Sequence, residues 1–307
     1  MHRSGTSFCV RSLQIRGINL PGNLLPAAND NPDGFQEPAE LVALNERLLS
    51  YADGLWDASW PLQSTKSPEL IKRIGCELQS LLNQWCLKSE SDIRKTSSKQ
   101  LLALKDPRLC RTLPLLYPCL EPGHCKWGIA IIREPNAVVA SLLERNGDDM
   151  SPLKGFALWM RYNLDMVKCR SINPQISDWP IISFETLLKD APGTLQPILK
   201  QWDNKGLFVE HQPEQELISK TAKSVPDRLS GLPKHWLELG QKFHSCLRES
   251  QTLNDVPKSV IQAVEQWLET TPELSHELLA LEARRRAHLG EALAAERAKH
   301  VLSWRNL

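Results

Sequence analysis

The chain has 307 residues, of which 41% are hydrophobic and 24% are charged. This length and composition can bury a substantial core, and they are typical of one large globular domain or of a domain with an appendage. The formal net charge is only +1, so no overall basic field makes nucleic acid or an anionic membrane the main partner.

The first residues form a loop of small and hydroxylated residues with one basic side chain, Arg3-Ser4-Gly5-Thr6-Ser7. A helix is predicted directly after it, over residues 8–16. Backbone N–H groups of such a loop and the N-terminus of the helix can cradle a phosphate or sulfate. The same residue types also cap helices and form turns, so both interpretations stay open. With one glycine, and with the basic residue before it, the loop lacks the usual ATP- or GTP-binding arrangement.

The next segments alternate between helical and strand-like patterns. Residues 18–38 have loop chemistry, and helical periodicity returns at 39–51 and 68–87. Three apolar runs are predicted as buried strands, each followed by a helix: 101–105, 127–132 and 180–184, with helices at 108–116, 137–146 and 186–201. This alternation predicts an α/β fold with a parallel sheet covered by helices. Ligands of such sheets bind beyond the carboxyl ends of the strands.

The last third of the chain is predicted to be helical. Helices are expected at 234–248 and 258–270, and a long helix at 272–304 that Thr271 caps. Its heptad stripe is interrupted at Arg285 and His288, which favours a solvated or loosely docked helix over a coiled coil. We therefore divide the chain into an α/β core at 1–204, a helical part at 205–271 that completes the domain, and a C-terminal helix at 272–307.

A second segment with anion-binding chemistry follows the strand predicted at 127–132. Arg133 leaves that strand, Pro135 suits the first position of a helix, and Ser141 lies about two turns into it. An arginine fork and a hydroxyl on rigid elements can grip a phosphate. The alternative is that Arg133 covers the edge of the sheet and Ser141 packs beneath it.

Together, the two segments resemble the sulfotransferase superfamily that uses 3′-phosphoadenylyl sulfate (PAPS), and bacterial-type members in particular. The resemblance implies that Arg3, Ser4, Gly5, Thr6 and Ser7 bind the 5′-phosphosulfate. It implies that Arg133 and Ser141, eight residues apart, bind the 3′-phosphate. It also implies a P-loop-like sheet whose first strand precedes the loop. That strand is missing from this chain, so we expect a truncated start or an altered fold.

Further stretches carry the same resemblance, which extends over roughly residues 1–201. Residues 31–37, 105–109 and 183–188 match family segments, although Phe184 stands where the family often has Tyr. A weaker match at 225–229 implies that Arg228 lies in a region that covers the nucleotide in relatives.

The resemblance implies sulfuryl transfer from PAPS to a hydroxyl of an acceptor, a carbohydrate or another small hydroxylated molecule, without a metal. Arg3 and the loop would stabilise charge on the leaving phosphate oxygen. Glu37 is our first choice as general base. The alternative for Glu37 is an acid that complements the dipole of the helix at 39–51. Lys105, Asp106 and Arg108 could orient the acceptor or the sulfuryl group. Alternatively, Asp106 and Arg108 could pair with each other to shape the turn, and Lys105 could have a structural role.

Two other functions are considered. A P-loop kinase would use Asp106 as its magnesium carboxylate, but the loop has no lysine after its glycine. A sulfotransferase-like interaction protein would have a decayed active site and would recruit a protein partner through the C-terminal helix.

Membrane insertion and structural metals are not expected. No apolar run approaches the roughly 18 to 20 residues that span a bilayer, and no signal peptide is seen, so we predict a cytoplasmic protein. The eight cysteines are scattered and are expected to be reduced thiols. Cys119, His124 and Cys125 lack a second pair at zinc-finger spacing, so no metal site is predicted.

Overall fold

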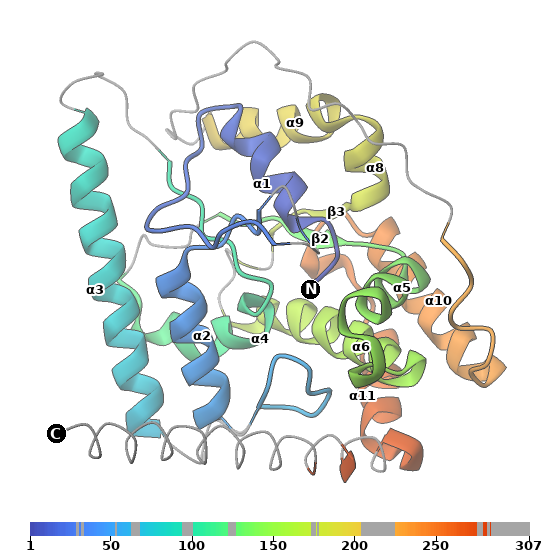
Figure 1. Ribbon diagram of the computed structural model, residues 1–307. Helices are drawn as coiled ribbons and strands as arrows, with labels where there is room; N and C mark the ends of the chain where they lie inside the picture. Colours follow the sequence, from blue (N-terminus) through green and yellow to red (C-terminus); the bar gives the residue numbers. More distant parts are fainter. Residues whose placement is uncertain are drawn as a thin grey trace, which may run out of the picture.

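The computed structural model describes 1–28, 31, 34–52, 54–62, 68–93, 101–121, 127–172, 176, 178–203, 225–274, 279–280 and 283, with the side chains of 88–93 left out. This part of the chain is mostly helical, with a small sheet of two parallel strands (Figure 1). The strands are β2 (Ala130–Ile132) and β3 (Ile181–Ser183), and Ile131 pairs with Ile182. The α/β class predicted from the sequence is therefore confirmed at the general level of helices combined with a parallel sheet.

Two of the three predicted strands form, and the third does not. β2 and β3 lie inside the apolar runs at 127–132 and 180–184, and all three residues of β2 are buried. The run at 101–105 makes only an isolated parallel bridge, between Asn19 and Leu102. Among the described residues, this ladder is limited to the two hydrogen bonds that Asn19 exchanges with Leu101 and Ala103. The prediction of a full strand there was wrong, because a strand needs a continuous partner to pair its amides and carbonyls.

Most predicted helices form within a few residues of the expected bounds. The long helices are α1 (Thr6–Gln14), α2 (Ala39–Tyr51), α3 (Pro68–Ile93), α4 (Leu109–Leu116), α5 (Pro135–Asn146), α6 (Pro152–Lys168), α9 (Ala191–Asp203), α10 (Lys234–Glu249) and α11 (Lys258–Thr270). Shorter ones are α8 (Phe184–Lys189), η1 (Tyr117–Cys119), η2 (Gly147–Asp149), η3 (Cys169–Ser171) and η4 (Leu253–Asp255).

The helix predicted at 186–201 is two helices. Asp190 has a non-helical backbone between α8 and α9, and its carboxylate accepts a hydrogen bond from the Gly193 amide at 2.8 Å. A short polar side chain that bonds the backbone in this way competes with helix continuation. This break at Asp190 is why two helices form where one was predicted.

Helix α6 was not predicted, and it is the centre of the core. Of its 17 residues, 13 are buried, including Phe156, Trp159 and Tyr162. Polar side chains within it, including Lys154, Arg161 and Asn163, are buried together with the apolar ones, so its burial does not follow a simple apolar stripe. Its local start signal is present, because the Ser151 side chain caps the Lys154 amide and Pro152 occupies the first helical position.

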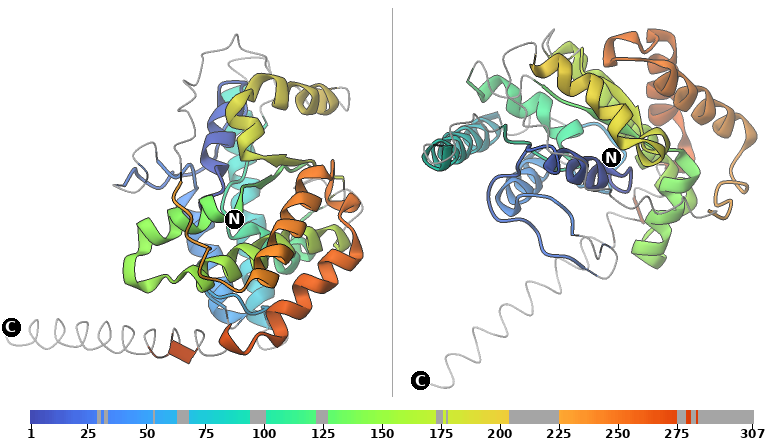
Figure 2. Two further views of the ribbon diagram at one scale, coloured as in Figure 1. Left: turned by 90° about the vertical axis from the view of Figure 1, so that its right-hand side faces the viewer. Right: turned by 90° about the horizontal axis from the view of Figure 1, so that it is seen from above.

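Helices cover both faces of the small sheet. Ile131 and Ile182 pack with residues of α1, α8 and α9, whereas Ala130 and Ile132 join the large cluster around α5, α6, α10 and α11. The alternation of side chains along a strand produces this division. Figure 2 shows α1, α8 and α9 on one side of the strands and α6 on the other. Helices α2, α3 and α4 pack as a separate cluster beside this core.

Some predictions concern residues outside the described part of the chain. These are most of the C-terminal helix at 272–307, residues 205–224, and His124 and Cys125. Within the described residues, no helix is long and apolar enough to cross a membrane. No group of three or more His, Cys, Asp or Glu side chains that could hold a metal ion is found in those residues either.

Candidate functional site

A cavity of about 190 Å³ opens where the first loop meets the ends of β2 and β3. Its walls come from segments far apart in the sequence: the first loop and α1, the segment before α2, residues 105–107, the residue after β2, α5, and the first residue of α8. Seven of the predicted site residues line it: Arg3, Gly5, Thr6, Ser7, Glu37, Lys105 and Arg133.

The backbone of the first loop adopts a conformation that requires glycine at position 5. Gly5 has φ +83° and precedes α1 as its N-cap residue. A Cβ atom added there would lie 2.0 Å from the ring of Phe184. Arg3 also has a positive φ, of 62°. The loop thereby turns sharply into α1, whose first residues Thr6 and Ser7 face the cavity. A helix N-terminus at a cavity favours an anion there.

Arg3 connects this loop to the second predicted segment. Its Nε donates a hydrogen bond to Ser141 Oγ at 2.8 Å, although 138 residues separate the two. Its carbonyl accepts a hydrogen bond from Arg133 Nη1 at 2.9 Å. The Arg133 guanidinium also lies over the Phe184 ring, 4.9 Å from its centroid. The two segments that the sequence singled out therefore meet in one place.

The start of α5 fixes the position of Arg133. Glu134 is the N-cap of this helix, and its carboxylate accepts hydrogen bonds from the amides of Asn136 at 3.0 Å and Ala137 at 2.7 Å. Pro135 occupies the first helical position, as expected. A carboxylate cap complements the helix dipole and rigidifies the turn. Arg133 thus projects from the rigid junction between β2 and α5.

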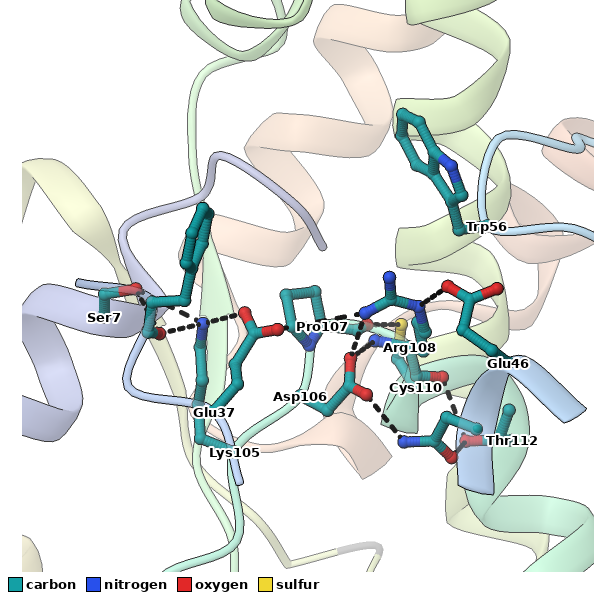
Figure 3. Close-up of polar contacts among 12 residues, drawn as sticks. Ser7, Glu37, Glu46, Trp56, Lys105, Asp106, Pro107, Arg108, Cys110 and Thr112 are labelled. Atoms are coloured by element: carbon teal, nitrogen blue, oxygen red, sulfur yellow. Dashed lines mark hydrogen bonds and ion pairs between the residues drawn. The ribbon is translucent and has the colours of Figure 1, made fainter. Parts of the chain in front are cut away.

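Lys105 links the first loop to Glu37. Its Nζ donates to Glu37 Oε1 at 2.5 Å, to the Phe35 carbonyl at 2.8 Å and to Ser7 Oγ at 3.2 Å (Figure 3). Lys105 is 7% exposed and Glu37 5%. Burial raises the pKa of Glu37 above its ordinary value, and burial lowers the pKa of Lys105. Three acceptors match the three N–H donors of a lysine ammonium.

The carboxylate of Glu37 is not used to cap α2. That helix begins at Ala39, Pro38 is its N-cap residue, and no side chain caps it. The Glu37 side chain instead contacts Lys105, and its Oε2 lies 3.8 Å from Arg108 Nη1. Glu37 therefore contacts basic side chains and not the start of α2, where its alternative role as a first-turn acid would place it.

Asp106 and Arg108 pair with each other, as one of the two interpretations proposed. Arg108 Nη1 lies 3.0 Å from Asp106 Oδ1, and the Arg108 amide donates to the same oxygen. The other oxygen of Asp106 accepts from Asn45 Nδ2 at 2.8 Å, and Arg108 Nε donates to Glu46 at 2.6 Å. Figure 3 shows these contacts continuing from the Glu37 and Lys105 pair toward Thr112 in α4. Both oxygens of Asp106 are therefore engaged, one by Arg108 within the turn and the other by Asn45 of α2.

The cavity is locally basic, although the chain is nearly neutral. One carboxylate, Glu37, faces five basic side chains in its lining: Arg3, Arg11, Lys105, Arg133 and Arg145. Three of them come from segments that the sequence had singled out. Arginines gathered at a helix N-terminus and at a sheet edge provide charge and directed N–H donors for oxyanions. The local charge therefore favours a multiply charged anion.

Ser4, Ser141 and Arg228 lie outside the cavity lining. Ser4 is 1% exposed, and its hydroxyl has no hydrogen-bond partner among the described residues. Ser141 contacts the lining residue Arg3. Arg228 is exposed, but its amide donates to Asn136 Oδ1 at 2.7 Å, which anchors its segment beside the start of α5.

Three basic lining residues were missed from the sequence: His2, Arg11 and Arg145. Arg11 had a signal, because it lies four residues after Ser7 on a predicted helix and so on the same face. Arg145 similarly follows Ser141 by four residues, and its guanidinium lies 5.3 Å from the centroid of the Trp56 ring. His2 directly precedes the loop, but a histidine at that point has no distinctive pattern.

The chain was also compared with models of protein families, with curated proteins and with solved structures. None of the three comparisons found a match. The site itself is therefore the basis for assigning a function.

Proposed function

We propose that the protein is a sulfotransferase that transfers the sulfuryl group of PAPS to a hydroxyl of an acceptor. The observation that carries the proposal is that Arg3 and Arg133 line one cavity and contact each other there, and that Ser141 is bonded to Arg3. These residues come from the two segments that the resemblance assigns to the two ends of the nucleotide. Their proximity is what a single site for both ends of the nucleotide requires.

We further propose that the sheet is the centre of a P-loop-like core. Arg133 follows β2 and Phe184 follows β3, and the two strands are parallel, so both residues lie at the carboxyl edge of the sheet. The glycine loop faces the same edge, since Gly5 packs against Phe184. Ligands of parallel α/β sheets bind at this edge.

In the proposed reaction, the acceptor oxygen attacks the sulfur of PAPS in line with the bond that breaks. The new bond joins the acceptor oxygen to sulfur, and the bond between sulfur and the 5′-phosphate oxygen breaks. The leaving electron pair stays on that oxygen, and the products are a sulfate ester and adenosine 3′,5′-bisphosphate. Arg3 and the N–H groups at the start of α1 stabilise the developing charge, as preorganised donors do in acyl and phosphoryl transfer.

Glu37 is the proposed general base of this reaction. It lines the cavity, and its raised pKa makes it a better proton acceptor near neutral pH than an ordinary glutamate. Lys105 holds the carboxylate 2.5 Å from its ammonium and also contacts Ser7 of the anion loop. This contact fixes the base relative to the bound sulfuryl group. The acceptor is proposed to be a carbohydrate or another small hydroxylated molecule.

Calorimetric titration tests this function against the kinase alternative. The wild-type protein is titrated with adenosine 3′,5′-bisphosphate without metal, and separately with ATP and Mg²⁺. The proposal predicts saturable binding of the bisphosphate and weaker binding of ATP with Mg²⁺. Asp106, the carboxylate that a kinase would use for magnesium, has both oxygens engaged by Arg108 and Asn45. Preference for ATP with Mg²⁺ would contradict the proposal.

A further inference from the structure

His2 borders the cavity directly before the anion loop, and aromatic contacts fix its ring. The ring lies edge-to-face against Trp56 and Tyr162, with centroid separations of 5.1 and 5.7 Å. The residue is 7% exposed and lines the cavity beside Arg3. Edge-to-face packing holds the plane of a ring without using its nitrogen atoms. The imidazole is therefore positioned, and its hydrogen-bonding capacity is not consumed by that positioning.

One nitrogen of this ring has no partner. Nε2 of His2 is buried and makes no hydrogen bond with any described residue. The nearby Tyr162 hydroxyl donates to the Trp56 carbonyl at 2.6 Å instead. A buried polar atom without a partner costs free energy, and native structures seldom keep one without a function. Since His2 lines the cavity, we look to a ligand bound there for the missing partner of this nitrogen.

The surroundings keep the imidazole neutral. Burial lowers the pKa of His2 well below 6.5, and neighbouring positive charges lower it further. The charged groups that act on it are Arg108, the amino terminus, Arg145 and Lys105. A neutral imidazole provides one N–H donor and one acceptor. It suits an uncharged hydroxyl, whereas the arginines and backbone amides of the cavity suit the anionic groups of PAPS.

On the basis of the proposed function, we propose that His2 binds the acceptor: its Nε2–H donates a hydrogen bond to the oxygen of the acceptor hydroxyl while that hydroxyl donates to Glu37. The hydroxyl proton moves to Glu37 as the oxygen–sulfur bond forms, and His2 keeps its own proton. A nitrogen base with a lowered pKa is a poor proton acceptor, and a carboxylate with a raised pKa is a better one. His2 therefore orients the nucleophile, and orientation of a reacting atom accelerates its attack.

Two matched variants test this role. His2→Phe keeps an aromatic ring between Trp56 and Tyr162 but removes the nitrogen, whereas His2→Gln places an amide N–H near the position of Nε2. Sulfuryl transfer from labelled PAPS is measured with water and with a panel of p-nitrophenyl glycosides as acceptors. Affinity for adenosine 3′,5′-bisphosphate and the midpoint of thermal unfolding are measured for every variant.

The inference predicts that His2→Phe lowers kcat by about tenfold or more, with bisphosphate affinity unchanged, and that His2→Gln recovers most of the loss. Unchanged turnover in His2→Phe would overturn the role of His2 alone. Equal losses of turnover and of bisphosphate affinity in both variants would show a structural role and would also overturn it. A wild-type protein that neither binds the bisphosphate nor turns over PAPS would overturn the proposed function itself.

Discussion

Arg3 Nε donates a hydrogen bond to Ser141 Oγ at 2.8 Å and so joins the first loop to α5. Arg133 strengthens the junction, because its Nη1 donates to the carbonyl of Arg3. A ligand bound at the loop is therefore close to the segment that follows β2. A phosphate that binds to Ser141 would displace Arg3 from the serine hydroxyl. We therefore expect the Arg3 side chain to move when the nucleotide binds.

Replacement of Arg133 is expected to weaken nucleotide binding. Arg133→Ala removes a charged N–H fork and should reduce the affinity for adenosine 3′,5′-bisphosphate by about 2 kcal/mol, as for a charge-assisted phosphate contact. Calorimetry measures the loss. Arg73→Ala, which changes an exposed arginine of α3, is the matched control and should bind like the wild-type protein. Equal affinities of Arg133→Ala and the wild-type protein would show that Arg133 contacts no phosphate.

Replacement of Gly5 is expected to disrupt the anion loop. Gly5→Ala combines a left-handed backbone with a Cβ atom 2.0 Å from Phe184, so it should lower the free energy of unfolding by about 1–3 kcal/mol and abolish bisphosphate binding. Gly231→Ala is the control, because a Cβ atom there would meet nothing within 4 Å. Denaturant unfolding and calorimetry compare the two variants. Equal stability and binding in both would rule out the close packing of the loop on Phe184.

Replacement of Glu37 is expected to slow the chemical step. Glu37→Gln should lower kcat by about 10²–10⁴-fold, the usual contribution of a general base, with bisphosphate affinity nearly unchanged. Glu40→Gln is the control, because Glu40 contacts Asn23 and does not line the cavity. A kcat that is the same in Glu37→Gln and Glu40→Gln would exclude Glu37 as the base.

The pH profile provides a separate test of Glu37. The base must be deprotonated to act, so kcat should fall as the pH falls through the pKa of Glu37. Because burial raises that pKa, the limb should lie above pH 4.5, the ordinary value for glutamate. The limb should disappear in Glu37→Gln. Persistence of the same limb in that variant would assign it to another group.

Replacement of Lys105 is expected to destabilise the site through Glu37. Lys105→Met leaves a buried carboxylate without its closest partner, and breaking such a pair costs about 3–5 kcal/mol. Combining Lys105→Met with Glu37→Gln should cost less than the sum of the two single changes, because the amide leaves no uncompensated charge. Denaturant unfolding of the four proteins gives the coupling. Strict additivity would mean that the 2.5 Å contact contributes nothing to stability.

Local patterns predicted much of the fold. The apolar runs that became β2 and β3 and the periodic segments that became α2 and α11 were recognisable because their signals are short in range. Helix α6 was missed, although Ser151 and Pro152 mark its start in the sequence. The run at 101–105 looked like a strand by composition, but its pairing depends on a partner elsewhere in the chain.

The site was predictable where residue types and spacing carry chemistry. Arg3, Arg133 and Ser141 were identified in this way, and they meet in the structure. The contacts of Glu37 with Lys105, and the ring packing of His2, depend on tertiary structure, and nothing in the local sequence specifies them. The position of Arg145 also depends on tertiary structure, because the packing of α5 places its side chain beside Trp56.

The central claim is that one cavity holds both phosphate ends of the nucleotide, and comparing two ligands tests it most directly. The wild-type protein is titrated with adenosine 3′,5′-bisphosphate and with adenosine 5′-monophosphate, which lacks the 3′-phosphate. The account predicts that the bisphosphate binds at least about tenfold more tightly, a difference of about 1.4 kcal/mol, and that Arg133→Ala removes this preference. Equal affinity of the wild-type protein for the two nucleotides would contradict the two-phosphate site.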